Sequence, residues 1–232
     1  MVIISKSIKL FRKSLLVFSI FFNLIFIFPI TIIAHETYGD AMKWYDNQRP
    51  KIDPRQNYFI GLKFENDGKH QKALSFFKKA ADKGLIEAQV KVGLYFLKSE
   101  NLVEQKKARE IFKSLSDINN PSASFKLGWM YENAIGGEKN IYKASYFYKL
   151  AASRDQHNAY LYLANLSLTY PDNINILLAA SYSAMAKKKN VYGADTLLNN
   201  LLPLLEIDEL DEMEILISSL ESEIQKIKLI NS

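Results

Sequence analysis

The sequence predicts an all-α protein built from helical hairpins that stack one on the next. Three observations support this fold class. Residue patterns return about every 35 positions, apolar residues within each repeat follow helical spacing, and helix-breaking residues separate the segments. The chain has 232 residues, and its 48% hydrophobic and 24% charged content is typical of a folded globular protein rather than a disordered one.

Two interleaved series of alanines define the repeat. Ala73, Ala108, Ala144 and Ala179 lead four segments that align without gaps, and these alanines are 35, 36 and 35 residues apart. The intervening segments begin at alanines with the same three spacings: Ala88, Ala123, Ala159 and Ala194. Two series that keep one period through most of the chain indicate a repeat architecture.

Each half-repeat is predicted to be a helix. In the third repeat, small and aromatic residues recur at i, i+3, i+4, i+7 and i+8, which is one face of an α-helix: Ala144, Phe147, Tyr148, Ala151 and Ala152. Helix breakers stand where the helices should end: Gly84, Asn119–Pro121, Gly136–Gly137, Pro171–Asn173 and Asn190. Each repeat is therefore expected to be a helical hairpin.

Glycines within the first helix of each hairpin indicate close packing. Gly61, Gly93 and Gly128 recur in mid-helix, although glycine there costs about 1 kcal/mol relative to alanine. We expect the missing side chain to let the second helix approach closely. Four recurring aromatic residues are expected to fill the space between neighbouring hairpins: Phe77, Phe112, Tyr148 and Tyr182. A hairpin cannot bury its own apolar face, so its neighbours must supply the core.

At these residues the chain resembles the Sel1-like repeat family, which is related to the tetratricopeptide repeats. The third repeat carries most of the family pattern: Ala123, Leu127, Gly128, Tyr131, Gly136, Gly137, Ala144, Tyr148, Ala151 and Ala152. The first repeat has the shorter tetratricopeptide spacing, the second has Val92 in place of the leucine, and the fourth has Ala164 in place of the glycine. The resemblance covers about residues 54 to 200.

The resemblance implies a right-handed α-solenoid of about four to five helical hairpins, placed after an N-terminal hydrophobic helix. It also implies a concave face, lined by the first helices, that binds a protein or peptide. By tetratricopeptide analogy, the candidate partner-binding residues on this face are Tyr58, Leu62, Leu94, Phe125, Trp129, Leu161 and Asn165. The alternative is that several of these side chains are simply buried between helices, and for Phe125 and Leu161 both interpretations stay open.

The first 34 residues follow a different pattern. An apolar run at 15–33 is followed by the small Ala34. Four basic residues precede the run: Lys6, Lys9, Arg12 and Lys13. This order is typical of a secretory signal peptide. The run is also long enough to span a bilayer, for which about 18–20 residues are needed. Residues 1–34 are therefore predicted to be a cleaved signal peptide or a retained signal anchor.

Both outcomes for residues 1–34 place the rest of the chain outside the cytoplasm, because lysine and arginine stay on the cytoplasmic side. The protein is expected to be exported, either periplasmic or secreted, or anchored in the inner membrane by residues 15–33. The next segment, 35–53, is interpreted as a tether or leading cap, and 54–203 as the repeats. Residues 204–232 are predicted to form a C-terminal capping helix that begins near Asp208, with an oligomerisation helix as the alternative.

The charge of the chain excludes one class of partner. The formal net charge is +5, and the first 34 residues hold four of the basic residues and no acidic one, so the rest of the chain is close to neutral. A nearly neutral body has no field that attracts nucleic acid, and contact with a membrane is expected only through an uncleaved N-terminal segment.

No set of residues predicts catalysis, a cofactor or a metal site. The chain has no cysteine, and His35, His70 and His157 lack the spacing of a metal site. Ser75-Phe-Phe-Lys78 matches the Ser-x-x-Lys motif of penicillin-recognising enzymes, but it lies on a repeated helix and no Lys-Thr-Gly accompanies it. Some exported family members with paired cysteines are described as acting on β-lactams, and this cysteine-free chain departs from them.

The sequence thus predicts a non-enzymatic, extracytoplasmic scaffold that binds a protein or peptide on the concave face of a Sel1-like solenoid. Two alternatives stay open at this stage. One is an enzyme that acts on the cell wall or on β-lactams through a reactive serine. The other is a membrane-anchored assembly subunit that keeps residues 1–34 as its anchor.

Overall fold

The structure is a computed structural model that describes residues 53–169 and 175–231. The chain divides into two compact units, Met1–Asp53 and Pro54–Ser232, and the second contains every described residue except Asp53. The predicted signal peptide or anchor and nearly all of the tether lie outside the described residues, so the divisions at 34, 53 and 203 stay predictions. No helix within the described ranges is both long and apolar enough to cross a membrane.

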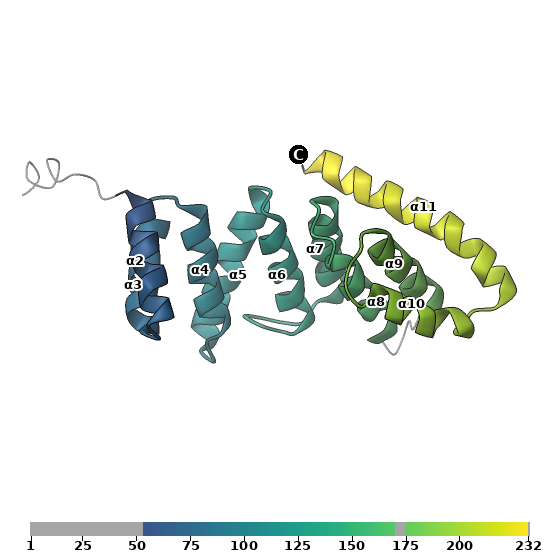
Figure 1. Cartoon of the computed structure of the whole chain (residues 1–232), viewed down its shortest axis with the longest axis horizontal. Helices are drawn as coiled ribbons and strands as arrows, with labels where there is room; N and C mark the ends of the chain where they lie inside the picture. The colour runs from purple at the N-terminus through teal and green to yellow at the C-terminus, as the bar shows by residue number, and fades with distance from the viewer. Residues whose placement is uncertain (1–52, 170–174, 232) are drawn as a thin grey trace, which may run out of the picture. The chain divides into compact units, whose positions relative to one another are not determined.

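Within the described residues the fold is helical and contains no strand. Four helical hairpins follow one another in chain order, then a single short helix, a 3₁₀ turn and one long helix (Figure 1). The bounds of these elements are α2 (Pro54–Asn66), α3 (His70–Ala81), α4 (Ile86–Leu97), α5 (Leu102–Asp117), α6 (Pro121–Glu132), α7 (Ile141–Ser153), α8 (Ala159–Thr169), α9 (Ile176–Lys188), α10 (Ala194–Leu201), η1 (Leu202–Leu204) and α11 (Ile207–Ile230). The α-solenoid of helical hairpins predicted from the sequence is confirmed.

The two alanine series mark the positions where helices meet. Every member of both series is at most 1% exposed, in the first helices α4, α6, α8 and α10 as well as in the second helices α3, α5, α7 and α9. The face predicted for the third repeat is also the buried one, with Ala144, Tyr148 and Ala151 fully buried. Small side chains at these points let the helix axes approach each other closely. The same close contact recurs in each hairpin, which explains the 35-residue period of the alanines.

The mid-helix glycines accommodate the aromatic rings of their own hairpins. A Cβ atom on Gly61 would stand 2.6 Å from the Phe77 ring, one on Gly93 would stand 3.0 Å from Phe112, and one on Gly128 would stand 2.8 Å from Tyr148. The expected close approach of the two helices is confirmed. Phe77, Phe112 and Tyr148 therefore also fill space within their own hairpins, which the sequence reasoning did not predict.

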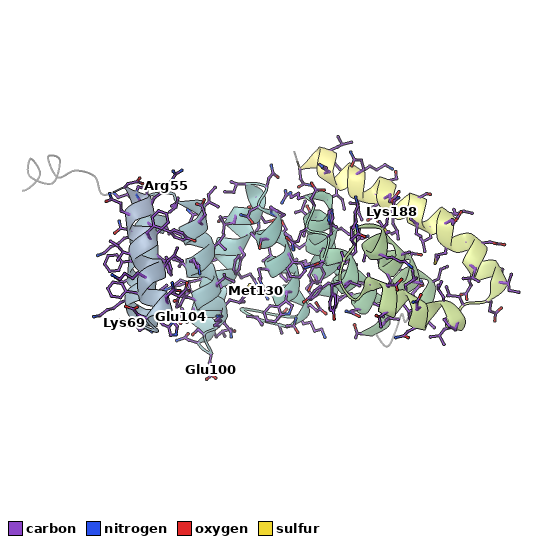
Figure 2. All side chains as sticks on the ribbon, viewed as in Figure 1. Arg55, Lys69, Glu100, Glu104, Met130 and Lys188 are labelled. Carbon is purple, nitrogen blue, oxygen red and sulfur yellow. The ribbon has the colours of Figure 1, made fainter. Side chains whose placement is uncertain are left out.

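Two of these rings also reach the next hairpin. The centroid of Phe77 lies 5.9 Å from that of Tyr95 on α4, and the centroid of Tyr148 lies 5.3 Å from that of Tyr162 on α8. Met130, labelled in Figure 2, is fully buried in the core that also contains Phe77. One buried ring therefore joins the two helices of its hairpin and the hairpin that follows.

Most of the predicted breakers adopt left-handed backbone conformations. Gly84, Asn119 and Asn190 have φ values of +84°, +66° and +57°. Gly136 has φ of +73°, and a Cβ there would stand 2.5 Å from the carbonyl oxygen of Gln105 on α5, so both conformation and space require glycine. The breaker at Pro171–Asn173 lies outside the described residues.

The C-terminal helix α11 lies against α7 and α9, the second helices of two hairpins (Figure 1). Its Leu220 and Ile224 are buried in the core formed by α7, α8 and α9. Lys188, labelled in Figure 2, makes a 2.9 Å ion pair with Glu221 of α11. The helix begins at Ile207, near the predicted start, but its cap is not Asp208. The residue before the helix is Glu206, whose backbone N–H donates to the Glu209 carboxylate at 2.9 Å.

Candidate partner-binding face

All seven candidate residues lie on the first helices α2, α4, α6 and α8, and we call the surface that they form the first-helix face. Six of them form three pairs whose members are one helical turn apart: Tyr58 and Leu62, Phe125 and Trp129, and Leu161 and Asn165. Asn165 is exposed, and the other six side chains are half-buried. None of the seven is fully buried, so each offers some surface to solvent while it also packs on the core.

The first end of the face combines aromatic and charged groups. Tyr58 packs on Phe77 with ring centroids 5.6 Å apart. Beside it, a pocket of about 350 Å³ lies between α2 and α4, with Leu94 in its wall together with polar and charged residues: Glu65, His70, Lys91, Tyr95 and Lys98. This end therefore combines an aliphatic side chain, Leu94, with charged and hydrogen-bonding groups.

Two charged groups of this pocket form an ion pair. Lys91 donates to the Glu65 carboxylate at 2.6 Å, with both side chains about a quarter exposed. Burial raises the pKa of the Tyr95 hydroxyl, and the carboxylate of Glu65 raises it further. Tyr95 is therefore a hydrogen-bonding phenol at neutral pH rather than a charged group.

An aromatic cluster forms the middle of the face. The Phe125 ring lies edge-on to Tyr162 with centroids 4.7 Å apart and is tilted against Tyr148 at 5.5 Å. The Tyr148 hydroxyl donates to the carboxylate of Glu132, the last residue of α6. Burial raises the pKa of Tyr148, and Glu132 raises it further. Phe125 thus packs on neighbouring rings and keeps a partly exposed edge, and its partner-binding role stays a prediction.

Trp129 lies where the two larger cores of the described unit meet. Its side chain packs against the core of α2–α6 and also against the core of α7–α9 and α11. Its backbone carbonyl accepts a hydrogen bond of 2.9 Å from the Asn133 amide. An indole that is half-buried over a packed core is pre-ordered, so a partner can bind it at a small entropic cost.

The far end of the face, on α8, is less aromatic. Leu161 packs on the core of α7–α9, whereas the side chain of Asn165 is exposed. The Asn165 backbone carbonyl accepts a 2.7 Å hydrogen bond from the Thr169 hydroxyl near the end of α8. The structure therefore brings the seven candidates onto one series of helices, in an aromatic middle flanked by a charged end and a polar end.

Several residues of this face were missed by the sequence reasoning. Glu65 and Lys98 lie one helical turn beyond Leu62 and Leu94, so extending the helical spacing by one turn would have found them. Arg109 carried no such signal. Its guanidinium stacks on Tyr131 at 4.3 Å and donates to the Ile135 carbonyl at 2.6 Å, which holds the turn between α6 and α7.

A second arginine holds the preceding turn. Arg154, which follows α7, donates to the Ser116 carbonyl on α5 at 2.9 Å, to the Ser124 hydroxyl on α6 at 2.9 Å and to the Asn119 side chain in the turn at 2.6 Å. Burial lowers the pKa of the Arg154 guanidinium, which still carries its charge at neutral pH. Both arginines act on the loops that space the first helices, so they position the face without contributing to its surface.

The motif considered for β-lactam chemistry lies away from this face. Ser75 and Lys78 are both exposed on α3. The Lys78 ammonium lies over the Phe96 ring, 5.0 Å from its centroid, and no hydrogen bond between the two residues is present in the described structure. Within residues 53–169 and 175–231, no group of three or more histidine and carboxylate side chains is placed to hold a metal ion.

Comparisons with known proteins agree with this geometry. Residues 58–85 and 121–156 match the model of the Sel1 repeat. DAP3-binding cell death enhancer 1 is 35% identical to the chain over 88 residues in the mouse and 36% identical over 88 residues in the rat. These matches cover 38% of the chain, which spans only 17% of the length of each of these two relatives.

Two solved structures share the fold. A protective antigen of uropathogenic Escherichia coli strains that displays an SLR fold superposes with a TM-score of 0.63 at 19% identity, over 82% of the chain and 42% of the antigen. A Sel1 repeat protein from Oxalobacter formigenes superposes with a TM-score of 0.55 at 23% identity, over 73% of the chain and 70% of that protein. Residues 58–85 and 121–156 are therefore similar to Sel1 repeats, and the described part of the chain has the helical-repeat fold of these two structures.

Proposed function

We propose that the protein is an extracytoplasmic scaffold that binds a protein or peptide partner through its first-helix face. The observation that carries this proposal is the partly exposed aromatic and apolar stripe that remains after the hairpins have packed. Tyr58, Phe125 and Trp129 are each held by the core beneath them and each keep an exposed part. Pre-ordered aromatic side chains of this kind supply much of the binding energy at protein interfaces.

The form of the face favours a peptide segment as the bound element. Its residues are spread along four successive first helices, which suits an extended or helical segment laid across them. The pocket beside Leu94 adds a lysine and a carboxylate that can orient such a segment. Two mammalian relatives that match 38% of the chain carry the name DAP3-binding, and that name supports a partner-binding function as the class proposed here.

The test of this proposal is partner capture by a double variant. Tyr58→Ala with Trp129→Ala removes the anchors at two points of the face. The matched control is Phe59→Ala with Tyr192→Ala, because these aromatics are 64% and 99% exposed and do not belong to the face. Proteins captured by the wild-type chain from an envelope extract should be lost with the first pair and kept with the second, at unchanged helix content. Equal capture by all three proteins overturns the assignment of the face.

The proposed location rests on residues 1–34 and has its own test. We infer that these residues direct the chain out of the cytoplasm, either as a cleaved signal or as an inner-membrane anchor. The intact mass of the native protein distinguishes the two forms, since cleavage removes the first 34 residues. A chain recovered at full mass from the soluble cytoplasmic fraction contradicts both.

A further inference from the structure

Among the described helices, α2 and α3 form the first hairpin, so a neighbouring hairpin covers only one of their sides (Figure 1). On the covered side, Glu65 of α2 pairs with Lys91 of α4. The ammonium of Lys78 on α3 lies over the Phe96 ring of α4. Helical spacing puts Phe76, two residues before Lys78, on the other side of α3. We call that other side of the hairpin the end face, and its residues are Ile60, Phe64, Lys72, Phe76 and Lys79.

The end face has an apolar centre with positive charges at its edge. The Phe64 and Phe76 rings are stacked with centroids 5.4 Å apart, and Ile60, one turn before Phe64, is 40% exposed. The Lys72 ammonium lies 5.8 Å from the Phe64 centroid, and the Lys79 ammonium lies 4.8 Å from the Phe76 centroid. Neither lysine makes an ion pair with a described residue. Both ammonium groups are therefore able to pair with the carboxylates of a binding partner.

The apolar centre of the end face departs from the usual end of a solenoid, whose outer side is polar. Towards the other end of the described unit, α11 packs over α7 and α9 (Figure 1). No described helix covers Phe64 and Phe76 in this way, and both rings are only half-buried. A partly exposed apolar patch with a charged edge is typical of a surface that binds another protein. The first-helix face is separate, because Ile60 is two residues from Leu62 and so lies on another side of α2.

The first half of α11 has the complementary charge. Residues 207–219 contain five acidic residues and no basic residue. Met213 packs inward on the core of α9 and α10. Asp208, Asp211 and Ile215 recur at i, i+3 and i+7 and therefore lie together on the outer side of the helix. Both of these aspartates are exposed and make no ion pair with a described residue, and Ile215 is 74% exposed. We call this surface the acidic side of α11.

The two complementary surfaces lie at different places in the row of helices. The end face belongs to α2 and α3, whereas α11 lies against α7 and α9 (Figure 1). The acidic side of α11 therefore complements the end face of a second copy rather than that of its own chain. A symmetric contact is unfavourable, because two end faces would bring lysines together and two acidic sides would bring carboxylates together.

We propose that copies of this chain associate head to tail, with the end face of one copy on the acidic side of α11 of the next. In this contact Ile215 packs on the rings of Phe64 and Phe76. The carboxylates of Asp208 and Asp211 pair with the lysines that lie over these rings. Because two different surfaces meet, each copy keeps one surface of each kind for a further copy, and the association forms an open chain or a closed ring.

Single cysteines can report this contact, because the chain has none of its own. The experiment mixes two full-length chains with different tags in a mild detergent. One carries Gln56→Cys, one turn before Ile60, and the other carries Ser218→Cys, one turn after Glu214 on α11. A short bismaleimide should join the two chains to each other and neither chain to itself. Ser114→Cys, at an exposed position of α5, is the matched control for Ser218→Cys and should give no product with Gln56→Cys.

Charge exchange tests the pairing of the two surfaces. Lys72→Glu with Lys79→Glu on the Gln56→Cys chain should lower the yield of cross-linked product about tenfold, as expected when two exposed ion pairs become like-charge contacts. Asp208→Lys with Asp211→Lys on the other chain should have the same effect. When both chains carry their reversed charges, the yield should recover. This recovery also shows that both variants are folded.

Two further controls separate this contact from unspecific association. Lys106→Glu with Lys107→Glu, an equal change of charge at exposed positions of α5, should leave the yield unchanged. About 1 M NaCl, at which the Debye length is about 3 Å, should lower the yield for the wild-type surfaces. Self-linking of the Gln56→Cys chain, equal product with Ser114→Cys, or yields that do not follow the charge exchange each overturn the head-to-tail contact.

Discussion

Gly128 on α6 faces the ring of Tyr148 on α7 so closely that a Cβ atom on the glycine would stand 2.8 Å from the ring carbon Cδ1. The same Cβ would stand 3.2 Å from the carbonyl oxygen of Ala144, one turn earlier on α7. Tyr148 cannot retreat, because it is fully buried and its hydroxyl is hydrogen-bonded to Glu132. The spacing of the two helices in this hairpin is therefore set by the absence of one methyl group.

Gly128→Ala should destabilise the chain even though alanine is the better helix former. Overpacking a filled core costs about 1–3 kcal/mol, which exceeds the gain of about 1 kcal/mol in helix propensity. Chemical denaturation of the variant should show a lower midpoint. Ser122→Ala, an exposed change on the same helix, is the control and should not lower it. A higher midpoint for Gly128→Ala would mean that the contact with Tyr148 is not tight.

Ala144→Leu tests the opposite side of the same contact. Ala144 is fully buried, and its backbone oxygen already lies close to Gly128, so three additional carbon atoms have no space. We expect a loss of about 1–3 kcal/mol in the free energy of unfolding. Lys143→Leu, at an exposed position next to it, should leave stability nearly unchanged. An unchanged melting temperature for Ala144→Leu contradicts the packing assigned to the alanine series.

The sequence predicted this part of the fold because a repeat displays its contacts several times. Gly61, Gly93 and Gly128 each face an aromatic ring sixteen to twenty residues later in the chain. Because this glycine–aromatic contact recurs in three hairpins, the repeat period alone predicts it. Arg109 occurs once at its position, and nothing in a single sequence shows that it reaches the Ile135 carbonyl of the next hairpin. Non-repeated contacts depend on loop geometry, which local patterns do not encode.

The same limit applies to the site and to the C-terminal helix. The i, i+4 pairs on the first helices were predictable because helical spacing alone places Phe125 and Trp129 on one side. That Phe125 also packs on Tyr162, from the next hairpin, required the distance between hairpins. The apolar spacing of α11 predicted a helix, yet its contacts with α7 and α9 depend on where its connecting loop sends it.

Arg109→Leu should destabilise the turn between α6 and α7. It removes the hydrogen bonds to the carbonyls of Ile135 and Met130 and the stacking on Tyr131, at a cost of about 1–3 kcal/mol for carbonyls left without a donor. Amide hydrogen exchange should rise around Ile135 more than in α2. Lys106→Leu, exposed on the same helix α5, is the control. Unchanged amide hydrogen exchange near Ile135 would mean that the Arg109 guanidinium does not stabilise this turn.

Stability should fall in alkali because of two buried tyrosines. Burial raises the pKa of both Tyr148 and Tyr182 above the value of 10.0 that a tyrosine has in the unfolded chain. The unfolded state then loses protons that the native state keeps, so stability is intact below pH 10 and is lost as the pH rises beyond it. Melting temperatures measured between about pH 8 and pH 11 should show this decline.

The variant that isolates the effect is Tyr148→Phe with Tyr182→Phe, which should show a smaller alkaline decline than the wild type. The matched control is Tyr142→Phe with Tyr192→Phe, because these two tyrosines are 87% and 99% exposed. The control variant should show the full alkaline decline in melting temperature. Because its lysines are those of the wild type, the comparison also corrects for their titration. Identical pH profiles for the two double variants would assign the decline to other groups.

The attachment of α11 can be assigned to apolar burial rather than to charge. Leu220 and Ile224 are each 6% exposed, and truncation of a buried aliphatic side chain costs about 2–5 kcal/mol. The ion pairs Lys149–Glu223 and Lys188–Glu221 have carboxylates that are 47% and 45% exposed, and such pairs contribute about 0–1 kcal/mol each. Leu220→Ala with Ile224→Ala should therefore abolish the protection of α11 from hydrogen exchange, whereas Glu221→Gln with Glu223→Gln should reduce it only slightly. Strong loss of protection in the second variant, or in the wild type at high salt, would show that the ion pairs hold the helix.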